Sequence, residues 1–150
     1  MSDERKRVLF VCIGNSCRSQ MAEAFARAYG SDVMYPASAG LAPATEIAPD
    51  TMEAMRAKSL DLRDQFPKHL RHMSRVQFDL IVNMSGMELP SALNARTVEW
   101  DVPDPVMMEY EEHCEVRDLI ERKVMQLILE LRRGQSEPKL KGQGSIWVKE

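Results

Sequence analysis

The stretch VLFVCIGNSCRSQMAEAF, residues 8–25, decides the fold because a strand, a short loop and a helix follow one another within it. Its first four residues form a continuous apolar run, as expected of a strand that is buried on both faces of a parallel sheet. Apolar residues then recur at helical spacing over residues 19–29, and Gly30 is placed to end that helix. Cys12 therefore lies where a buried strand meets the N-terminus of a helix.

Strand and helix patterns alternate along the rest of the chain. Pro36 lies near the middle of the second expected strand, which places this strand at an edge of the sheet. The order predicts an α/β fold: a three-layer sandwich with a small, mainly parallel four-stranded sheet flanked by helices. The expected strands are residues 7–12, 32–40, 78–84 and 95–100, and the expected helices are residues 19–29, 49–58, 67–73 and 109–133.

The chain has 150 residues, enough for one domain with a substantial core and too few for two ordinary domains. We expect this domain to span residues 1–133. Residues 134–150, GQSEPKLKGQGSIWVKE, show no periodicity and have the polar composition of a flexible C-terminal tail.

The composition excludes several classes of protein. Hydrophobic residues make up 44% of the chain and charged residues 29%, and no apolar run reaches the ~20 residues of a membrane span. The N-terminal sequence has no apolar signal region, so we expect a cytoplasmic location and no membrane partner. The net charge of -3 argues against a nucleic-acid partner.

The three cysteines, Cys12, Cys17 and Cys114, are an odd number without metal-site companions. This pattern argues against a structural disulfide framework and fits a reducing compartment. Any cysteine chemistry is therefore expected to be catalytic or redox, without a metal or another cofactor.

The loop after Cys12 has the features of an anion-binding site, because ligands of parallel α/β sheets bind beyond the carboxyl ends of the strands. Gly14 and Asn15 tolerate left-handed backbone angles, which lets successive N–H groups converge on an anion. The following helix adds its positive end, and Arg18 can close over a tetrahedral oxyanion with two hydrogen bonds. The expected substrate-binding residues are Ile13, Gly14, Asn15, Ser16, Cys17, Arg18 and Ser19.

Cys12 is the candidate nucleophile. A helix N-terminus and a neighbouring cation both stabilise a thiolate, and Ser19 is placed to donate a hydrogen bond to it and to help it leave when an intermediate collapses. The alternative is that Cys12 is a small buried hydrophobe at a strand end, as most unpaired cysteines are. The strand before it, the Gly/Asn loop and the helix after it favour the nucleophile.

These residues resemble the phosphate-binding loop of the low-molecular-weight protein tyrosine phosphatases and of the thioredoxin-coupled arsenate reductases that share their fold. The resemblance implies that Cys12 attacks phosphorus in line, that Arg18 holds the equatorial oxygens, and that Asn15 and Ser19 brace the loop. It covers residues 7–133 and includes ASAG (37–40), DLRDQFPKHL (61–70), FDLIVNMSG (78–86) and WDVPDP (100–105).

The resemblance implies roles for three further residues. Asp104, in an Asp-Pro pair, corresponds to the acid that protonates the leaving group and then activates water. An Asp-Pro pair in a proline-rich loop is otherwise ordinary turn chemistry, and Asp101 is a competing carboxylate. Cys17 either forms a reversible disulfide with Cys12 or packs within the loop. Gln65 stands where the phosphatases often have a histidine that braces the loop asparagine.

The chain departs from both branches of that family. The arsenate reductases use a downstream cysteine pair whose first member follows the strand matching FDLIVN, whereas this chain has Met84 there and no cysteine from 18 to 113. Arsenate reduction would then need a small thiol, a redoxin or Cys114. The tyrosine phosphatases typically carry aromatic residues after the Asp-Pro pair, whereas this chain has Val106, Met107 and Met108.

The sequence thus predicts a cysteine-dependent phosphatase that hydrolyses phosphomonoesters, with phosphotyrosine in proteins as the expected substrate, through a phosphocysteine intermediate. Its partner would be a phosphorylated protein or a small aryl phosphate. The first alternative is an arsenate reductase that uses an external thiol or redoxin, and the second is a non-catalytic, oxyanion-binding regulatory module. The expected catalytic residues are Cys12, Arg18 and Asp104.

Overall fold

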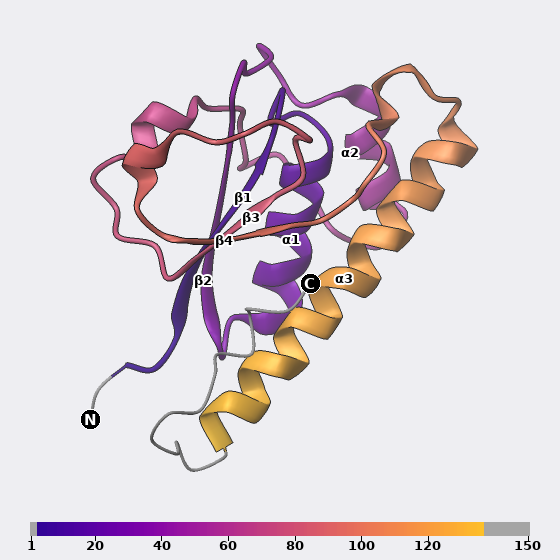
Figure 1. Cartoon of the computed structure of the whole chain (residues 1–150). Coiled ribbons are helices and arrows are strands. Elements are labelled where there is room, and N and C mark those ends of the chain that lie inside the picture. Colours follow the sequence, from indigo (N-terminus) through magenta and orange to yellow (C-terminus); the bar gives the residue numbers. More distant parts are fainter. Residues whose placement is uncertain (1–2, 137–150) are drawn as a thin grey trace.

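The computed structural model describes residues 3–136, in which strands and helices alternate as predicted (Figure 1). The strands are β1 (Lys6–Cys12), β2 (Met34–Gly40), β3 (Leu80–Asn83) and β4 (Arg96–Glu99). The α-helices are α1 (Arg18–Gly30), α2 (Pro49–Arg56) and α3 (Tyr110–Ser136), and the 3-10 helices are η1 (Leu70–Met73), η2 (Ser91–Leu93) and η3 (Pro105–Met107). The α/β class is therefore confirmed.

The four strands form one parallel sheet in the order β2-β1-β3-β4. β1 and β3 are central, and the apolar run of β1, residues 8–11, is fully buried. β2 contains Pro36 and is an edge strand, as that proline predicts. Because all strands run in one direction, their carboxyl ends meet at the same edge of the sheet, where Cys12 pairs with Gly40.

The two faces of the sheet are covered differently. Figure 1 shows the three α-helices on the same side of the strands, and they contribute Phe25, Met55 and Ile120 to the larger core cluster. The opposite face is covered by η1, η2 and loops, so the third layer is thin. The buried members of the smaller cluster on that face are Leu9, Val11, Ala39, Leu70, Phe78 and Ile81.

Gly30 ends α1 as predicted, but for a different reason from the expected one. Ser31, which follows it, is in the right-handed helical region, so no left-handed glycine turn closes the helix. A Cβ atom on Gly30 would lie 2.6 Å from Ile128 Cγ1. The glycine therefore lets α1 and α3 approach each other closely.

α3 continues past its predicted end at residue 133. Arg132 fixes the last turns, because its Nε donates to Asp32 Oδ2 over 2.8 Å. Residues 134–136, which the sequence analysis placed in a tail, are helical. The rest of that predicted tail, 137–150, lies outside the described residues.

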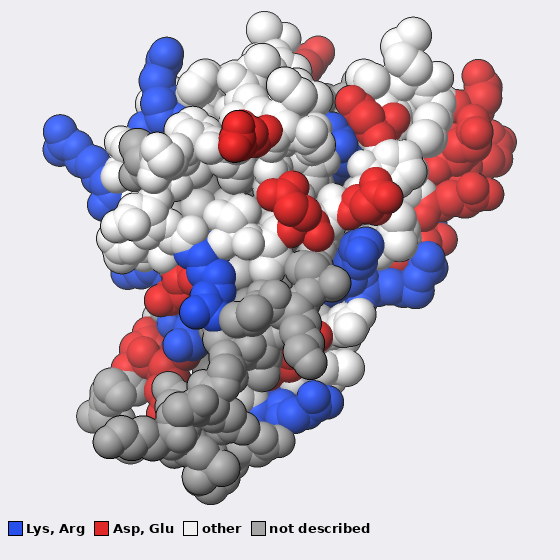
Figure 2. Space-filling view, viewed as in Figure 1, with Lys and Arg blue, Asp and Glu red and all other residues white. Residues whose placement is uncertain are grey.

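Acidic side chains gather over the first turns of α3, at the upper right of Figure 2, where Glu111 and Glu112 lie in the first turn. Carboxylates at a helix N-terminus are stabilised by the helix dipole, so this cluster has a structural explanation. Within residues 3–136, no helix has both the length and the apolar character to cross a membrane.

Candidate active site

The loop of residues 13–17 joins β1 to α1 at the carboxyl edge of the sheet. Of the two residues expected to tolerate left-handed angles, Asn15 adopts one, with φ 49°, and Gly14 does not. A single left-handed residue thus turns the chain between the strand and the helix.

The carbonyl groups of this loop are all hydrogen-bonded to its surroundings. Within the described residues, the backbone N–H groups of residues 13–16 make no hydrogen bond to the protein. Because a peptide N–H points away from its own carbonyl, these N–H groups face the inside of the loop, as they do in backbone anion-binding concavities. The carbonyls of Cys12, Ile13, Gly14 and Ser16 accept from the N–H groups of Leu41, Ala42, Ala44 and Ala48 over 2.8 to 3.2 Å, and that of Asn15 accepts from Gln20 Nε2 over 3.0 Å.

Cys12 and Ser19 are brought together as expected. Cys12 is only 2% exposed, and its Sγ lies 2.9 Å from Ser19 Oγ. Ser19 Oγ already accepts a hydrogen bond of 2.7 Å from Asn15 Nδ2. The hydroxyl proton of Ser19 is therefore available to the sulfur, which is the direction that stabilises a thiolate.

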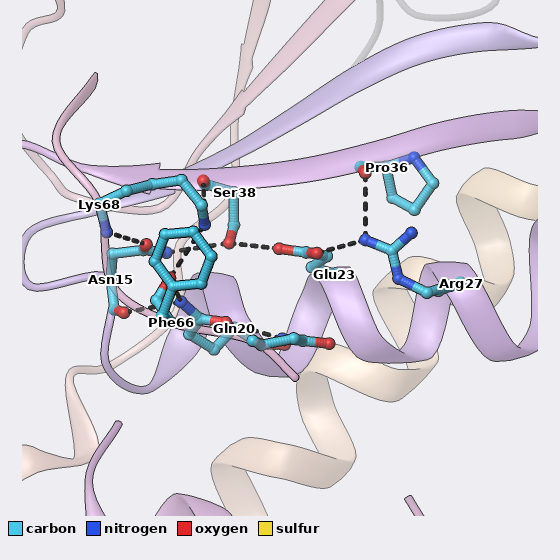
Figure 3. Close-up of polar contacts among 9 residues, drawn as sticks. Asn15, Gln20, Glu23, Arg27, Pro36, Ser38, Phe66 and Lys68 are labelled. Carbon is cyan, nitrogen blue, oxygen red and sulfur yellow. Dashed lines mark hydrogen bonds and ion pairs between the residues drawn. The ribbon is translucent and has the colours of Figure 1, made fainter. Parts of the chain in front are cut away.

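Asn15 connects the loop to a buried carboxylate (Figure 3). Its Nδ2 also donates to Ser38 Oγ over 3.0 Å, and Ser38 Oγ donates to Glu23 Oε1 over 2.6 Å. Glu23 is nearly buried and also pairs with Arg27. The hydrogen bonds thus run outward from the Asn15 amide, through Ser19 to Cys12 on one side and through Ser38 to Glu23 on the other, and they fix the orientation of that amide.

The segment around Lys68 supports these hydrogen bonds from outside the loop (Figure 3). Lys68 N donates to Asn15 Oδ1 over 2.9 Å, and its ammonium donates to the carbonyls of Ser38 and Phe66 over 3.1 and 3.0 Å. Burial lowers the pKa of Lys68, while the nearby Glu23 charge raises it. The sequence analysis missed Glu23 and Lys68.

Gln65 was expected to brace Asn15 directly, but it acts through another residue. Its Nε2 donates to Gln20 Oε1 over 2.7 Å, and Gln20 Nε2 donates in turn to the carbonyls of Asn15 and Phe66, both over 3.0 Å. A signal for this role was present, because Gln20, Glu23 and Arg27 are polar residues at helical spacing in an otherwise apolar part of α1.

Arg18 is buried, and its guanidinium is held by two backbone carbonyls, one after β3 and the other after β4. Its Nη1 donates to the carbonyls of Met84, over 2.6 Å, and Val102, over 3.1 Å. Its Nη2 lies 3.5 Å from Asp104 Oδ2. One end of the guanidinium is therefore anchored, and the other faces the candidate acid.

Asp104 makes the contact expected of turn chemistry and also lies beside Arg18. Its Oδ1 accepts from Val106 N over 3.1 Å and caps η3, which is turn chemistry, while its Oδ2 faces Arg18. Asp101 is exposed and makes no comparable contact with Arg18 within the described part of the chain. The geometry therefore brings Asp104, rather than Asp101, to the arginine.

Cys17, the last residue of the loop, is buried, and all three cysteines are unpaired. Burial raises the pKa of the Cys17 thiol, and the nearby Cys12 and Asp104 charges raise it further, while a hydrogen bond with Thr51 opposes them. This environment favours packing as a neutral thiol. Among residues 3–136, no group of three or more His, Cys, Asp or Glu side chains could hold a metal ion.

The family model described as low molecular weight phosphotyrosine protein phosphatase matches residues 7–137. This chain belongs to that family. The match confirms the resemblance found in the sequence and the cysteine-based chemistry that it implies.

Similar members of the family are named as arsenate reductases. Arsenate reductase 1 of Bacillus cereus is 33% identical over 122 residues, which are 79% of this chain and 90% of that protein. Glutaredoxin arsenate reductase of Synechocystis is 28% identical over 130 residues, 84% of this chain and 98% of that protein.

Solved structures show the same fold. An arsenate reductase in the phosphate binding state superposes with a TM-score of 0.78 at 28% identity, covering 84% of this chain and 98% of that one. The YwlE arginine phosphatase from Geobacillus stearothermophilus has a TM-score of 0.74 over 90% of this chain and 99% of that one, but at 22% identity it supports the fold alone.

Proposed function

We propose that this chain binds a tetrahedral oxyanion in the loop of residues 13–18 and reduces arsenate with electrons from an external thiol. The observation that carries the oxyanion site is the loop itself, with every carbonyl from Cys12 to Ser16 bonded outward and the N–H groups of residues 13–16 facing inward. The names of the similar family members support arsenate as the substrate. This reverses the order of the two enzyme functions predicted from the sequence.

Each candidate side chain has a role in this proposal. Cys12 Sγ is the nucleophile, and Ser19 donates to it from 2.9 Å. Arg18 balances the negative charge of the oxyanion with its Nη2 edge, because Nη1 is held by two carbonyls. Asp104, 3.5 Å from Arg18, protonates the departing oxygen.

The reaction balances with two external thiols. Cys12 Sγ attacks arsenic(V), an As–S bond forms, and one arsenate oxygen leaves as water after protonation by Asp104. A thiolate then attacks Cys12 Sγ, so that an S–S bond forms and the As–S electron pair stays on arsenic, which leaves as arsenite. A second thiol attacks the mixed disulfide and restores Cys12, so two thiols become one disulfide.

The resolving thiol is external in this proposal because the chain has no suitable internal one. There is no cysteine from 18 to 113, and Met84 stands at the position of the relay cysteine. Cys17 is a buried neutral thiol and belongs to the anion loop. The names of two similar proteins, a glutaredoxin arsenate reductase and a thioredoxin-dependent arsenate reductase, suggest redoxins as donors.

The second candidate function is hydrolysis of phosphomonoesters through a phosphocysteine. Met84 in place of a relay thiol favours it, since hydrolysis needs no thiol, and the Asp104 carboxyl faces Arg18 in the position of a leaving-group acid. Hydrolysis of phosphotyrosine would be a more specific version of this second function. Val106 and Met107, which are 62% and 91% exposed, offer only flexible aliphatic contact to a phenol ring.

A side-by-side steady-state assay tests the proposal. NADPH oxidation is measured with arsenate and either thioredoxin with its reductase or glutathione with glutaredoxin and glutathione reductase, and p-nitrophenyl phosphate hydrolysis is measured on the same protein. We expect arsenate-dependent NADPH oxidation that Cys12→Ser abolishes and Cys114→Ser leaves unchanged, because the second thiol is external.

Other results of that assay would identify the alternatives. Hydrolysis of p-nitrophenyl phosphate without arsenate-dependent oxidation in either system would establish the phosphatase. Loss of arsenate reduction in Cys114→Ser would make Cys114 the resolving thiol. Phosphate binding in calorimetry with neither activity would leave the regulatory module.

A further inference from the structure

We infer that Asn83 is a positioning residue for Arg18, because its side chain orients the peptide group of residues 84–85, whose carbonyl anchors the guanidinium. The inference rests on the proposed function only in that Arg18 contacts the bound oxyanion. The contacts that carry it lie at the carboxyl end of β3, one residue before the Met84 carbonyl.

Asn83 is the last residue of β3 and is 1% exposed, so its amide must be paired within the protein. Its Oδ1 accepts from the N–H and the hydroxyl of Ser85, over 3.0 and 2.7 Å. Its Nδ2 donates to the Met87 carbonyl over 2.7 Å and to the Glu99 carboxylate of β4 over 3.1 and 3.2 Å. Because a carbonyl only accepts hydrogen bonds, the amide nitrogen must face Met87 and the amide oxygen must face Ser85.

The bond to Ser85 determines the direction of the Met84 carbonyl. That carbonyl and the Ser85 N–H belong to one trans peptide group, which is planar, so the two groups point in opposite directions. Asn83 Oδ1 accepts from the N–H over 3.0 Å, and Arg18 Nη1 donates to the carbonyl over 2.6 Å. The peptide group is thus held on both sides, and a rotation that released the N–H would turn the carbonyl away from Arg18.

The turn after Met84 has little other support. Met84 itself is fixed by the sheet, since its N–H donates to a carbonyl of β1 over 2.8 Å. Beyond it, Gly86 is left-handed, with φ 75°, and no atom of a non-neighbouring residue lies within 4 Å of the position that a Cβ would take. Met87 is 57% exposed. The turn is therefore held by the Asn83 amide and by the Ser85 hydroxyl, which accepts from Met87 N over 3.0 Å.

The consequence for the site is the edge that Arg18 presents to an anion. With Nη1 held by the carbonyls of Met84 and Val102, Nη2 faces Asp104. Rotation of the 84–85 peptide group would remove the shorter of the two Nη1 bonds and free the guanidinium to turn. An oxyanion would then have to order the arginine as it binds, which lowers its affinity.

Asn83→Thr and Asn83→Val form a matched pair, because threonine and valine have nearly the same shape and both suit a strand. Both variants lose the bonds from Nδ2, but a threonine hydroxyl two residues before Ser85 can still accept from its N–H. We expect Asn83→Val to bind inorganic phosphate roughly ten-fold more weakly than the wild type, as for the loss of one hydrogen bond to a charged group, and Asn83→Thr to recover part of the affinity.

The titration is followed by the 1H–15N shifts of the amides of residues 13–16, which also report weak binding. Thr97→Val is the control, because it makes the change from threonine to valine at an exposed position of β4, outside the site. It should leave the affinity for phosphate unchanged.

A double-mutant cycle with Arg18→Ala shows whether the effect passes through the arginine. In the Arg18→Ala background, Asn83→Thr and Asn83→Val should bind phosphate equally, because the group that the peptide positions is gone. A loss that came only from a loosened fold would instead separate the two variants by the same factor in both backgrounds.

Measurements without a ligand complete the test. In the wild type, Arg18 should give separate Nη1 and Nη2 signals in 15N spectra, because Nη1 is held by two carbonyls, and the Ser85 N–H should exchange slowly with solvent. The two Arg18 signals should merge in Asn83→Val and stay separate in Asn83→Thr.

Any of four results would overturn the inference: merged Arg18 signals or a rapidly exchanging Ser85 N–H in the wild type, wild-type affinity for phosphate in Asn83→Val, equal affinities in the Thr and Val variants, or the same difference between them without Arg18. If the wild-type protein neither turns over a substrate nor binds phosphate, the proposed function fails. The Arg18 signals and the Ser85 exchange then decide the inference alone.

Discussion

The backbone N–H of Lys68 donates to Asn15 Oδ1 over 2.9 Å, so a residue 53 positions further along the chain holds the left-handed residue of the anion loop. The side-chain Nδ2 of Asn15 donates to the hydroxyl groups of Ser19 and Ser38. All three bonds are made within the protein, so the loop has its shape before any anion enters. A loop that is already ordered loses less entropy when it binds.

Asn15→Ala should destabilise the protein by about 2–4 kcal/mol, because it leaves buried polar partners unsatisfied and keeps a left-handed backbone without glycine or asparagine. Asn94→Ala is the matched control: Asn94 is also left-handed, with φ 47°, but is exposed and outside the site. It should cost only about 1 kcal/mol. Urea unfolding of both variants measures the difference, and equal losses would contradict the bracing role.

Arg18→Lys should reduce kcat/KM by roughly 10²–10³, since an ammonium cannot bind two carbonyls at one end and face Asp104 with the other. Arg27→Lys is the control, because Arg27 is half exposed and pairs with Glu23 at the distal end of the chain of hydrogen bonds. Steady-state kinetics of both variants provide the comparison. Unchanged activity in Arg18→Lys would remove the arginine from the site.

Asp104→Asn should slow turnover by roughly 10²–10⁴, as expected for loss of a general acid, while Asp101→Asn stays near the wild-type rate. The reason is position: Asp104 Oδ2 lies 3.5 Å from Arg18 Nη2. Single-turnover rates separate this chemical step from substrate binding. A larger loss in Asp101→Asn would transfer the acid role to that residue.

Gly40→Ala should displace the anion loop, because the new Cβ would lie 2.6 Å from the Ile13 carbonyl oxygen and 2.9 Å from Asn15 N. These are backbone atoms, which cannot swing aside as a side chain can. Gly14→Ala, inside the loop, meets only Ser16 Cβ at 3.7 Å and should keep the fold. Thermal unfolding and phosphate calorimetry test both variants, and full anion binding by Gly40→Ala would show that the loop tolerates the displacement.

The stability of the protein should rise with pH over the range just below 6.5. Burial lowers the pKa of His113 in the folded state, so below 6.5 the unfolded chain takes up a proton that the folded chain does not, and acid favours unfolding. This pH dependence ends once the pH falls below the pKa of His113 in the folded state, because the folded and unfolded chains then both carry the proton. Urea unfolding from about pH 5 to 8 should show it in the wild type and in His72→Gln, but not in His113→Gln.

The local part of the candidate site could be predicted from the sequence. Cys12, Arg18 and Ser19 lie within eight consecutive positions of a strand-loop-helix unit, and such a unit has few possible geometries. The edge position of β2 was also predicted from a local feature, the proline Pro36 within the strand. In both cases a short-range pattern was enough.

The long-range part could not be predicted, because it depends on how distant segments meet. Lys68 reaches Asn15 from a loop, and His113 reaches Thr51 from 62 positions away. Neither contact leaves a periodic pattern in the sequence. Gly30 had a local explanation as a helix end, but its actual role depends on Ile128 of another helix.

Arg18 binds position 84 through the main chain, since Nη1 donates to the Met84 carbonyl and not to its side chain. A change of side chain at that strand end therefore leaves the anchor of the guanidinium in place. A cysteine in place of Met84 would therefore add a thiol at this strand end without changing the contact that holds Arg18. At this strand end, the supply of a thiol and the recognition of the anion are thus structurally independent, because one depends on the side chain and the other on the main chain.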